Sequence, residues 1–352
     1  MSEMTQMVAE TAERLLADHV NTDLLRAAEQ GTWPAELWQA LEENGLTQPM
    51  AAEEHGGIGA GWAEAFAIAH AAGYDAAPVP LAETIVAGWL LSQAGISVPE
   101  GLLTLIDDGH DLSRDGSAVS GKACAPWGNQ AAHAVAVFDE GGTWQAGVID
   151  ISDAACAPDL SLAHEPRDHL TLEAAGAEVA SLPITGGPSP ARLAGAAIRS
   201  AQMAGGLRRA VELGVQYATE RQQFGRPIAK FQAIQQMLAV AAAKAAEARM
   251  AAEYACLALD RAGGDIAAAA FDIAAAKIVT GEAVETINDV VHEVHGAIGF
   301  TEEHHLHFTT RRLWTWRGEF GAETFWSTYL GQRVLQRGAD NLWPDLTERQ
   351  SS

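Results

Sequence analysis

The segment 221–228, RQQFGRPI, places two arginines and an aromatic ring between two apolar stretches. At a helix end, Arg221 could offer its guanidinium to a pyrophosphate or a carboxylate, which it binds through paired N–H groups. Phe224 could pack against a flat ring. The simpler alternative is a turn in which Arg221 pairs with a neighbouring acid and Phe224 fills the core. Composition alone favours this alternative, because surface ion pairs are common.

A second motif, GAIGFTEEHHLH at 296–307, combines two glycines with three histidines. Glycines allow the backbone to approach a ligand closely. The histidines suggest a metal, but no second ligand cluster stands at a suitable spacing, so the sequence predicts no metal site. We expect a helix to begin here instead, with Thr301 as its N-cap and the next two glutamates in its first turn.

Two further patterns indicate no catalytic chemistry. GGIGAG at 56–61 follows a helical stretch rather than a strand, so it predicts a turn and not a dinucleotide-binding loop. The sequence has no GxSxG motif and no cysteine–histidine pairing that would suggest a nucleophile.

The three cysteines, Cys124, Cys156 and Cys256, are scattered and form no CxxC pair. This usage is typical of a reducing, cytoplasmic setting.

The overall charge excludes some partners. The 352 residues include 46 acidic and 22 basic side chains, a formal charge of −24. Such a polyanion lacks the clustered Lys and Arg that bind nucleic acid. No uncharged run of about 18 apolar residues predicts a membrane span, and the acidic, amphipathic N-terminus is unlike a signal peptide. Residues 188–352 hold 17 of the 22 basic residues, so we expect an anionic ligand in that half.

Hydrophobic spacing divides the chain into three predicted domains. Residues 1–99 show helical periodicity, as in WPAELWQALEENGL at 33–46. Residues 100–187 contain short β-branched segments bounded by Gly, Asp and Pro, which predict a small antiparallel, barrel-like unit. Residues 188–352 contain long Ala-rich stretches broken at GRPI, which predict an antiparallel helix bundle. Because strands and helices do not alternate, the order counts against a Rossmann fold.

Together these motifs resemble the acyl-CoA dehydrogenase family. YATERQQFGRPIAKFQAIQQMLA at 217–239 is similar to the family's most characteristic segment, and VHGAIGFTEEHHLHFTTRR at 294–312 is similar to its second. WPAELWQALEENGL and EEHGGIG match the N-terminal helical domain more loosely. The resemblance implies a mainly α fold with a central β-domain: an N-terminal α-helical domain, a small β-barrel-like domain and a C-terminal four-helix bundle.

The resemblance also implies FAD as cofactor, an acyl-CoA thioester as substrate and an electron-transferring flavoprotein as electron acceptor. Carried over by position, Arg221 would hold the FAD pyrophosphate and Phe224 would pack at the flavin. Gln232 would lie near the ADP part, and Gly296 would let the backbone approach the same cofactor. In the family these residues serve the flavin of a neighbouring subunit, which implies a dimer or a tetramer.

Several family features are missing from this sequence. The usual catalytic base is a Glu before Gly-Thr, but in WRGEFGAETFW at 316–326 the matching position holds Phe320. Glu319 comes one residue early, which turns a helical side chain by about 100°. A second family location for the base corresponds to Gly195. The Thr-Glu-Pro and Gly-Ser-Asp elements that contact flavin are absent, and Glu293 replaces a Gln just before the glycine turn.

We therefore interpret the chain as the partner subunit of a heteromeric acyl-CoA dehydrogenase, contributing the ADP-binding half of a flavin site. Two alternatives remain. The first is a self-sufficient homodimeric enzyme with an unorthodox base, for which Glu319 is the best candidate and Glu323 the next. The plainer explanation for both is an exposed acid near a helix end. The second is a non-catalytic assembly protein on the same scaffold, against which the retained Arg221–Phe224 pair argues.

Overall fold

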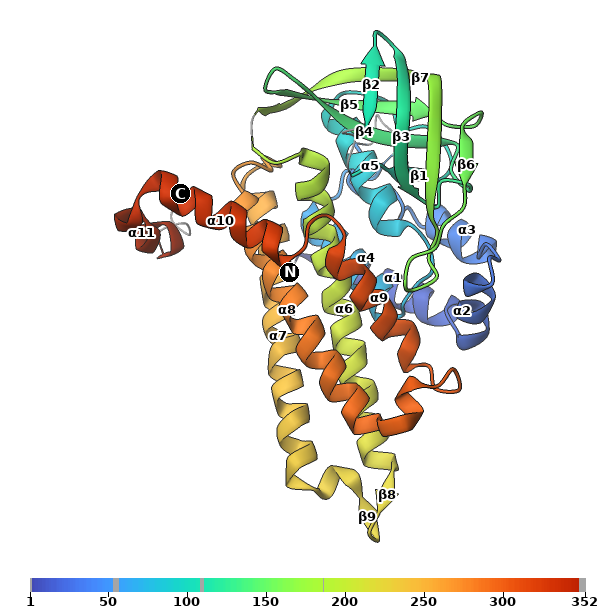
Figure 1. Ribbon diagram of the computed structural model, residues 1–352, viewed down its shortest axis with the longest axis vertical. Coiled ribbons are helices and arrows are strands. Elements are labelled where there is room, and N and C mark those ends of the chain that lie inside the picture. Colours follow the sequence, from blue (N-terminus) through green and yellow to red (C-terminus); the bar gives the residue numbers. More distant parts are fainter. Residues whose placement is uncertain (1, 53–56, 108–110, 186, 348–352) are drawn as a thin grey trace.

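The structure is a computed structural model, and it describes residues 2–52, 57–107, 111–185 and 187–347. A β-sheet region lies at one end, a long helical bundle extends away from it, and shorter N-terminal helices pack at the side (Figure 1). The expected mainly α fold with a central β-domain is confirmed.

The N-terminal helices surround a buried pair. These helices are α1 (Glu3–His19), α2 (Thr22–Glu29), α3 (Ala35–Glu43), α4 (Trp62–Tyr74) and α5 (Leu81–Gln93). α1 and α3 bury one apolar face each, whereas α4 and α5 are buried over most of their surface and form the centre of the domain. In the predicted GGIGAG turn, Gly56 lies outside the described residues, and the glycines after it lead into α4.

The central domain is one seven-stranded sheet. Its strands are β1 (Leu103–Leu105), β2 (Leu112–Asp115), β3 (Ala118–Pro126), β4 (His133–Glu140), β5 (Thr143–Asp150), β6 (Ala155–Ala157) and β7 (Arg167–Thr185). Their order is β1-β4-β5-β7-β3-β2, with β6 also on β7. The pairs are antiparallel except β1–β4, which is parallel. The 19-residue β7 pairs with β3 along its first half and with β5 along its second.

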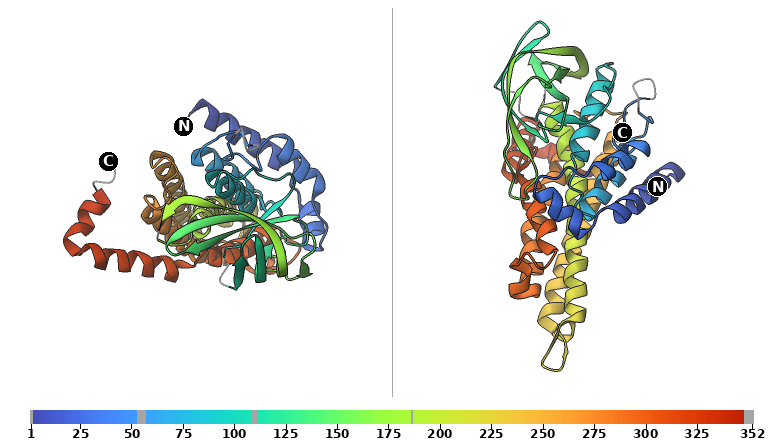
Figure 2. Two further views of the ribbon diagram at one scale, coloured as in Figure 1. Left: turned by 90° about the horizontal axis from the view of Figure 1, so that it is seen from above. Right: turned by 90° about the vertical axis from the view of Figure 1, so that its right-hand side faces the viewer.

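The C-terminal region is the helix bundle. Its elements are α6 (Pro190–Glu220), β8 (Gln222–Gln223), β9 (Arg226–Pro227), η2 (Ile228–Lys230), α7 (Gln232–Arg261), α8 (Ala270–His295), η3 (Gly296–Phe300), α9 (Leu306–Gly318), α10 (Glu323–Arg337), η4 (Ala339–Asn341) and α11 (Leu342–Thr347). Ser189 caps α6, and its side chain accepts a hydrogen bond from the Arg192 amide. α10 and α11 project away from the body of the molecule (Figure 2).

The predicted N-cap at Thr301 is wrong. α9 begins at Leu306, with His305 as its N-cap residue. The Thr301 amide and hydroxyl both donate to the carbonyl of Ile298, so this residue closes the preceding 3-10 turn instead. The non-helical segment between α8 and α9 is therefore longer than the helix-start signals in the sequence predict.

Some functional classes find no support in the described part of the chain. None of its helices is long and apolar enough to cross a membrane. Within the same residues, no group of three or more His, Cys, Asp or Glu could hold a metal ion. Cys124, Cys156 and Cys256 are free thiols.

Candidate functional site

The tip of the bundle, formed by the β8–β9 hairpin and η3, brings both sequence motifs together around one cavity of about 660 Å³. Arg221, Phe224 and Gly296, which the sequence predicts to bind a cofactor, all line this cavity. Gln232 is the exposed first residue of α7 and is not among the described lining residues. Three of the four predicted residues therefore share one site.

The three lining residues are available to a ligand. Arg221 is exposed, and its guanidinium forms no ion pair with any described residue. Phe224 is 91% exposed and has a φ of 54°, which is unusual for a residue other than glycine. Gly296 has a φ of 62° and open space where a Cβ would stand. The alternative in which Phe224 fills the core of a plain turn is therefore wrong.

The tip fits the pyrophosphate and a flat part of FAD. An unpaired guanidinium binds phosphate oxygens, an exposed ring offers a stacking surface, and an open glycine lets backbone amides approach. Glu293 also lines the cavity, and its negative charge opposes a pyrophosphate there. The tip lies at the opposite end of the bundle from the sheet (Figure 1), so it is remote from the chain's own domain junction.

Histidines pack against one another behind the tip. His295 is 4% exposed and stacks on Tyr217, with 4.4 Å between ring centroids. The His304 ring lies 4.6 Å from that of His295. Burial lowers the pKa of His295 to about 4, so this imidazole is neutral at pH 7. It supports the tip by packing rather than by charge.

A second, smaller cavity lies where the three domains meet. This central cavity has a volume of about 210 Å³. Its walls come from helices α5 and α6, strands β1, β3 and β7, and the residues after α9; they are Glu83, Leu105, Asp107, Cys124, Pro126, Arg167, Arg199, Glu319 and Phe320. The predicted base candidate, Glu319, therefore does face the domain junction.

Glu319 is held as an anion by two arginines. Its carboxylate accepts a 2.8 Å hydrogen bond from Arg167 Nε and lies 2.8 Å from Arg199 Nη2. Burial raises the pKa of Glu319, but the two guanidinium groups outweigh burial and hold the pKa below its usual value. A carboxylate in this state has low affinity for a proton, which works against a base role. That role stays a prediction.

Both family positions for the base meet in this structure. Phe320, at one position, packs directly on Gly195, at the other: a Cβ added to Gly195 would lie 2.2 Å from Cδ1 of the Phe320 ring. Phe320 has a φ of 54°, and Lys277 fixes the turn by donating to the carbonyls of Arg317 and Gly321. The Phe320 ring thus occupies the space that a side chain at position 195 would need.

The central cavity does not fit a flavin ring and a thioester together. Pockets for drug-sized ligands usually measure about 300 Å³ or more, whereas this cavity measures about 210 Å³. Its lining residues Glu83, Glu319, Arg167 and Arg199 are already paired with one another, and Asp107 pairs with Arg192. The small volume and the paired charges of the central cavity therefore argue against a flavin site there.

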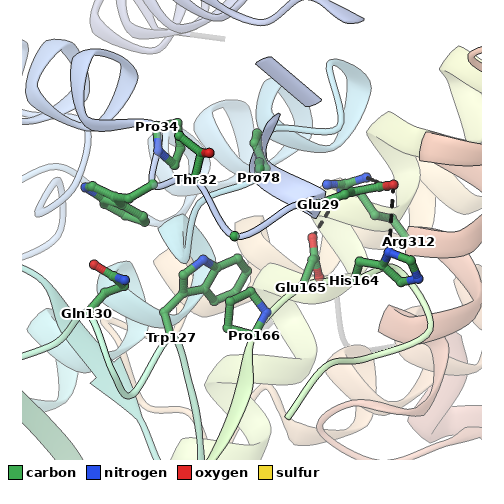
Figure 3. Close-up of a pocket in the computed structure, with 13 residues that line it drawn as sticks. Glu29, Thr32, Pro34, Pro78, Trp127, Gln130, His164, Glu165, Pro166 and Arg312 are labelled. Atoms are coloured by element: carbon green, nitrogen blue, oxygen red, sulfur yellow. Dashed lines mark ion pairs between the residues drawn. The ribbon is translucent and has the colours of Figure 1, made fainter. Parts of the chain in front are cut away.

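The charged side chains at the junction form one continuous series, which the sequence motifs did not indicate. We call it the interdomain ion-pair chain: Glu83, Arg199, Glu319, Arg167, Glu165, Arg312, Glu29 and Arg311, in that order. Figure 3 shows Arg312, Glu29 and Glu165 pointing toward one another beside Trp127. A charged residue inside an otherwise apolar helix face, such as Arg199 in α6, is the signal that could have found it.

Comparisons with known proteins agree with the fold. The model for the acyl-CoA dehydrogenase N-terminal domain matches residues 2–96, and that for the acyl-CoA dehydrogenase C-terminal domain matches residues 192–322. The chain is 26% identical to acyl-CoA dehydrogenase IpdE2 of Mycolicibacterium smegmatis over 321 residues, which cover 89% of this chain and 93% of that relative.

Two solved structures are similar over almost the full chain. The ChsE4–ChsE5 complex from Mycobacterium tuberculosis matches with a TM-score of 0.84 at 21% identity, covering 96% of this chain and 98% of the matched chain. A Tcur3481–Tcur3483 steroid ACAD variant matches with a TM-score of 0.84 at 22% identity, covering 96% and 99%. At these identities the likeness shows the fold alone.

Proposed function

Since the chain belongs to the acyl-CoA dehydrogenase family, whose members are flavoprotein oxidoreductases of lipid metabolism, we propose that it serves as the partner subunit of a two-chain acyl-CoA dehydrogenase. In this complex its bundle tip holds the ADP half of an FAD whose flavin ring lies in the other chain. The other chain supplies the catalytic base.

One observation carries the proposal: the tip keeps the residue types that the family uses to hold the cofactor, whereas the central cavity lacks a carboxylate at both family positions for the base. At the tip, Arg221, Phe224 and Gly296 are exposed around a cavity of about 660 Å³. At the junction, Phe320 and Gly195 occupy both positions for a base. A chain that keeps only the half of the site that faces outward needs a second chain to complete it.

The roles of the tip residues follow from their chemistry. The Arg221 guanidinium pairs with the pyrophosphate, and Phe224 stacks on a flat ring of the cofactor. These residues would hold FAD, which would supply hydride acceptance for the α,β-dehydrogenation of an acyl-CoA, while the base of the other chain would take the α-proton. An electron-transferring flavoprotein then takes up the electrons. The substrate class follows the similar structures, one described as a steroid enzyme, so we propose a steroid-derived acyl-CoA.

The proposal is tested by comparing the chain alone with the chain co-expressed with a catalytically complete acyl-CoA dehydrogenase chain from a neighbouring reading frame. We expect the lone chain to be colourless and inactive, and the pair to be yellow and to dehydrogenate an acyl-CoA with an artificial electron acceptor. A yellow, active homodimer contradicts the proposal. A stable but colourless pair points to the assembly role instead.

The self-sufficient alternative has one observation in its favour, since Glu319 lines the central cavity. If an active homodimer is obtained, Glu319→Gln decides the question. Loss of turnover with unchanged acyl-CoA affinity assigns Glu319 as the base. Unchanged turnover excludes it.

A further inference from the structure

The interdomain ion-pair chain joins all three domains, and the proposed role of the tip does not require it. Glu29 and Glu83 come from the N-terminal helices, and Glu165 and Arg167 from the sheet domain. The other members, Arg199, Arg311, Arg312 and Glu319, come from the bundle and the turn after α9. Charges alternate along the series, with four carboxylates and four guanidinium groups.

Most of its contacts cross a domain boundary. Glu83 Oε1 of α5 lies 2.5 Å from Arg199 Nη2 of α6, which joins the N-terminal helices to the bundle. Glu319 Oε1 lies 2.6 Å from Arg167 Nη2, which joins the bundle to the sheet.

The other end of the series repeats this pattern through different residues. Glu165 Oε1 lies 3.1 Å from Arg312 Nε, which again joins sheet and bundle. Arg311 donates to both carboxylate oxygens of Glu29 at 2.7 Å, which again joins the bundle to the N-terminal helices.

The domains complement one another in charge within this series. The N-terminal helices contribute two negative charges, the sheet contributes one of each sign, and the bundle contributes three positive charges and one negative charge. The side chains of Glu83, Glu165, Arg199 and Arg312 are each exposed by 2% or less. A buried charge without its partner is strongly destabilising, so removing one member of the series while the domains stay packed would leave its partner uncompensated.

Aromatic rings close the junction around the guanidinium groups. Arg199 Cζ lies 5.6 Å from the ring centroid of Trp316 and 5.5 Å from that of Phe320. Arg167 Cζ lies 5.0 Å from the Trp127 ring centroid. The same Phe320 ring packs on Gly195. One end of the interdomain ion-pair chain and these rings thus fill the space beside the central cavity.

We propose that the interdomain ion-pair chain is a clamp that holds the three domains in their relative positions. It does so without the help of a flavin bound in this chain's own central cavity. The inference rests on the proposed function, since a chain that lends only its tip to a cofactor must hold its junction by other means. Its arginines act as positioning groups for domains and touch no substrate.

The test uses thermal unfolding of the full-length chain without flavin. Arg199→Met leaves Glu83 without a cation, and we expect it to lower the unfolding midpoint by about 10 °C. Glu83→Gln, a milder change, should lower the midpoint by less and keeps the test usable if Arg199→Met does not fold. The double variant Glu83→Gln/Arg199→Met removes both charges of this ion pair, so we expect its loss to be well below the sum of the two single losses. Lys244→Met is the control, because Lys244 forms an exposed pair within α7.

Two outcomes would overturn the clamp. One is a midpoint for both Arg199→Met and Glu83→Gln that equals the midpoint of Lys244→Met. The other is a double variant whose loss equals the sum of the two single losses. Hydrogen exchange adds a readout of position: in Arg199→Met, exchange should rise in α5 and at the start of β7 and stay unchanged at the tip.

Flavin provides the remaining arm of the test. Excess FAD should leave the midpoint of the wild-type lone chain unchanged, and a rise of several degrees with a perturbed flavin spectrum contradicts flavin independence. The variants are measured without flavin, whereas the proposed function is judged by the flavin content and activity of the co-expressed pair. Either idea can therefore fail while the other stands.

Discussion

The surroundings of Arg221 indicate that it binds an anionic ligand. This charged side chain lines the cavity at the tip and forms no ion pair with the described residues. In the two-chain complex we expect Arg221→Met to weaken FAD binding at least tenfold, since a charge-assisted hydrogen bond contributes about 1.5–3 kcal/mol. The dissociation constant can be measured from FAD fluorescence.

Arg226→Met is the matched control for this change. Arg226 belongs to the same hairpin, and its guanidinium lies 4.4 Å from the Phe231 ring centroid rather than on the cavity wall. Both substitutions remove one positive charge from the tip, so long-range attraction falls equally in the two variants. Equal losses of FAD affinity would show that Arg221 makes no specific contact.

Residue roles could be predicted only where the residues share a short segment. Arg221 and Phe224 stand within one motif, and Gly296 stands in a second one. The partners of Glu319 were not predictable in this way, since Arg167 lies 152 positions before it in the chain. Pairing between distant segments is set by the packing of domains, which periodicity and motifs do not encode.

At the scale of elements, two glycines set how closely α4 and α6 approach. A Cβ on Gly205 of α6 would lie 1.9 Å from the His70 carbonyl oxygen, and one on Gly73 of α4 would lie 1.8 Å from the Gln202 carbonyl oxygen. Both obstacles are backbone atoms, which cannot rotate away as a side chain does. The contact between the N-terminal helices and the bundle therefore depends on the absence of side chains at these positions.

We expect Gly205→Ala to lower the free energy of unfolding by about 3 kcal/mol, at the upper end of overpacking costs, because α4 and α6 must separate. Denaturant titration of the chain measures this loss. Gly331→Ala, in α10, is the control, since no atom lies within 4 Å of its added Cβ. It should leave stability unchanged or raise it by up to about 1 kcal/mol. A Gly205 variant as stable as the Gly331 variant would disprove the close packing.

Helices were more predictable than strand and turn boundaries. The long Ala-rich helices α6 and α7 follow local propensity, and both form as expected. By contrast, the sequence predicts only short strands over residues 100–187, whereas β7 runs for 19 residues. Ala174 has a φ of 53° within it, so the chain bends there without ending. β7 stays continuous because β3 and β5 satisfy its backbone on either side of that bend.

At the scale of the whole molecule, the uneven distribution of charge along the sequence is explained by how the domains pack together. The C-terminal half, which holds 17 of the 22 basic residues, was expected to bind an anionic ligand, and the exposed Arg221 at the tip fits that expectation. Three of its arginines, Arg199, Arg311 and Arg312, instead neutralise carboxylates of the other two domains. The order of the domains could be predicted from hydrophobic periodicity. The ion pairs at their junction could not, because a single Glu or Arg in the sequence is indistinguishable from an ordinary surface charge until its partner is known.

Buried histidines should make the stability of the whole chain sensitive to acid. Burial lowers the pKa of His70 and of His295 from 6.5 to about 4. Between these values the unfolded chain binds protons that the folded chain does not, so stability falls as the pH drops from about 6.5 toward 4. Burial raises the pKa of Asp75 to about 6, and this single group acts in the opposite direction. The unfolding midpoint should therefore be clearly lower at pH 5 than at pH 7.5.

The contribution of the tip to this acid response can be isolated with one substitution. His295→Gln removes a titrating group but keeps a donor near the Val291 carbonyl, which accepts from His295 Nδ1 at 2.6 Å. We expect the variant to lose some stability at pH 7.5 and to show a smaller further loss at pH 5 than the wild type. His169→Gln is the control, because the His169 side chain is 60% exposed. If both variants keep the full acid response of the wild type, protonation of His295 does not contribute, and the response comes from other groups such as His70.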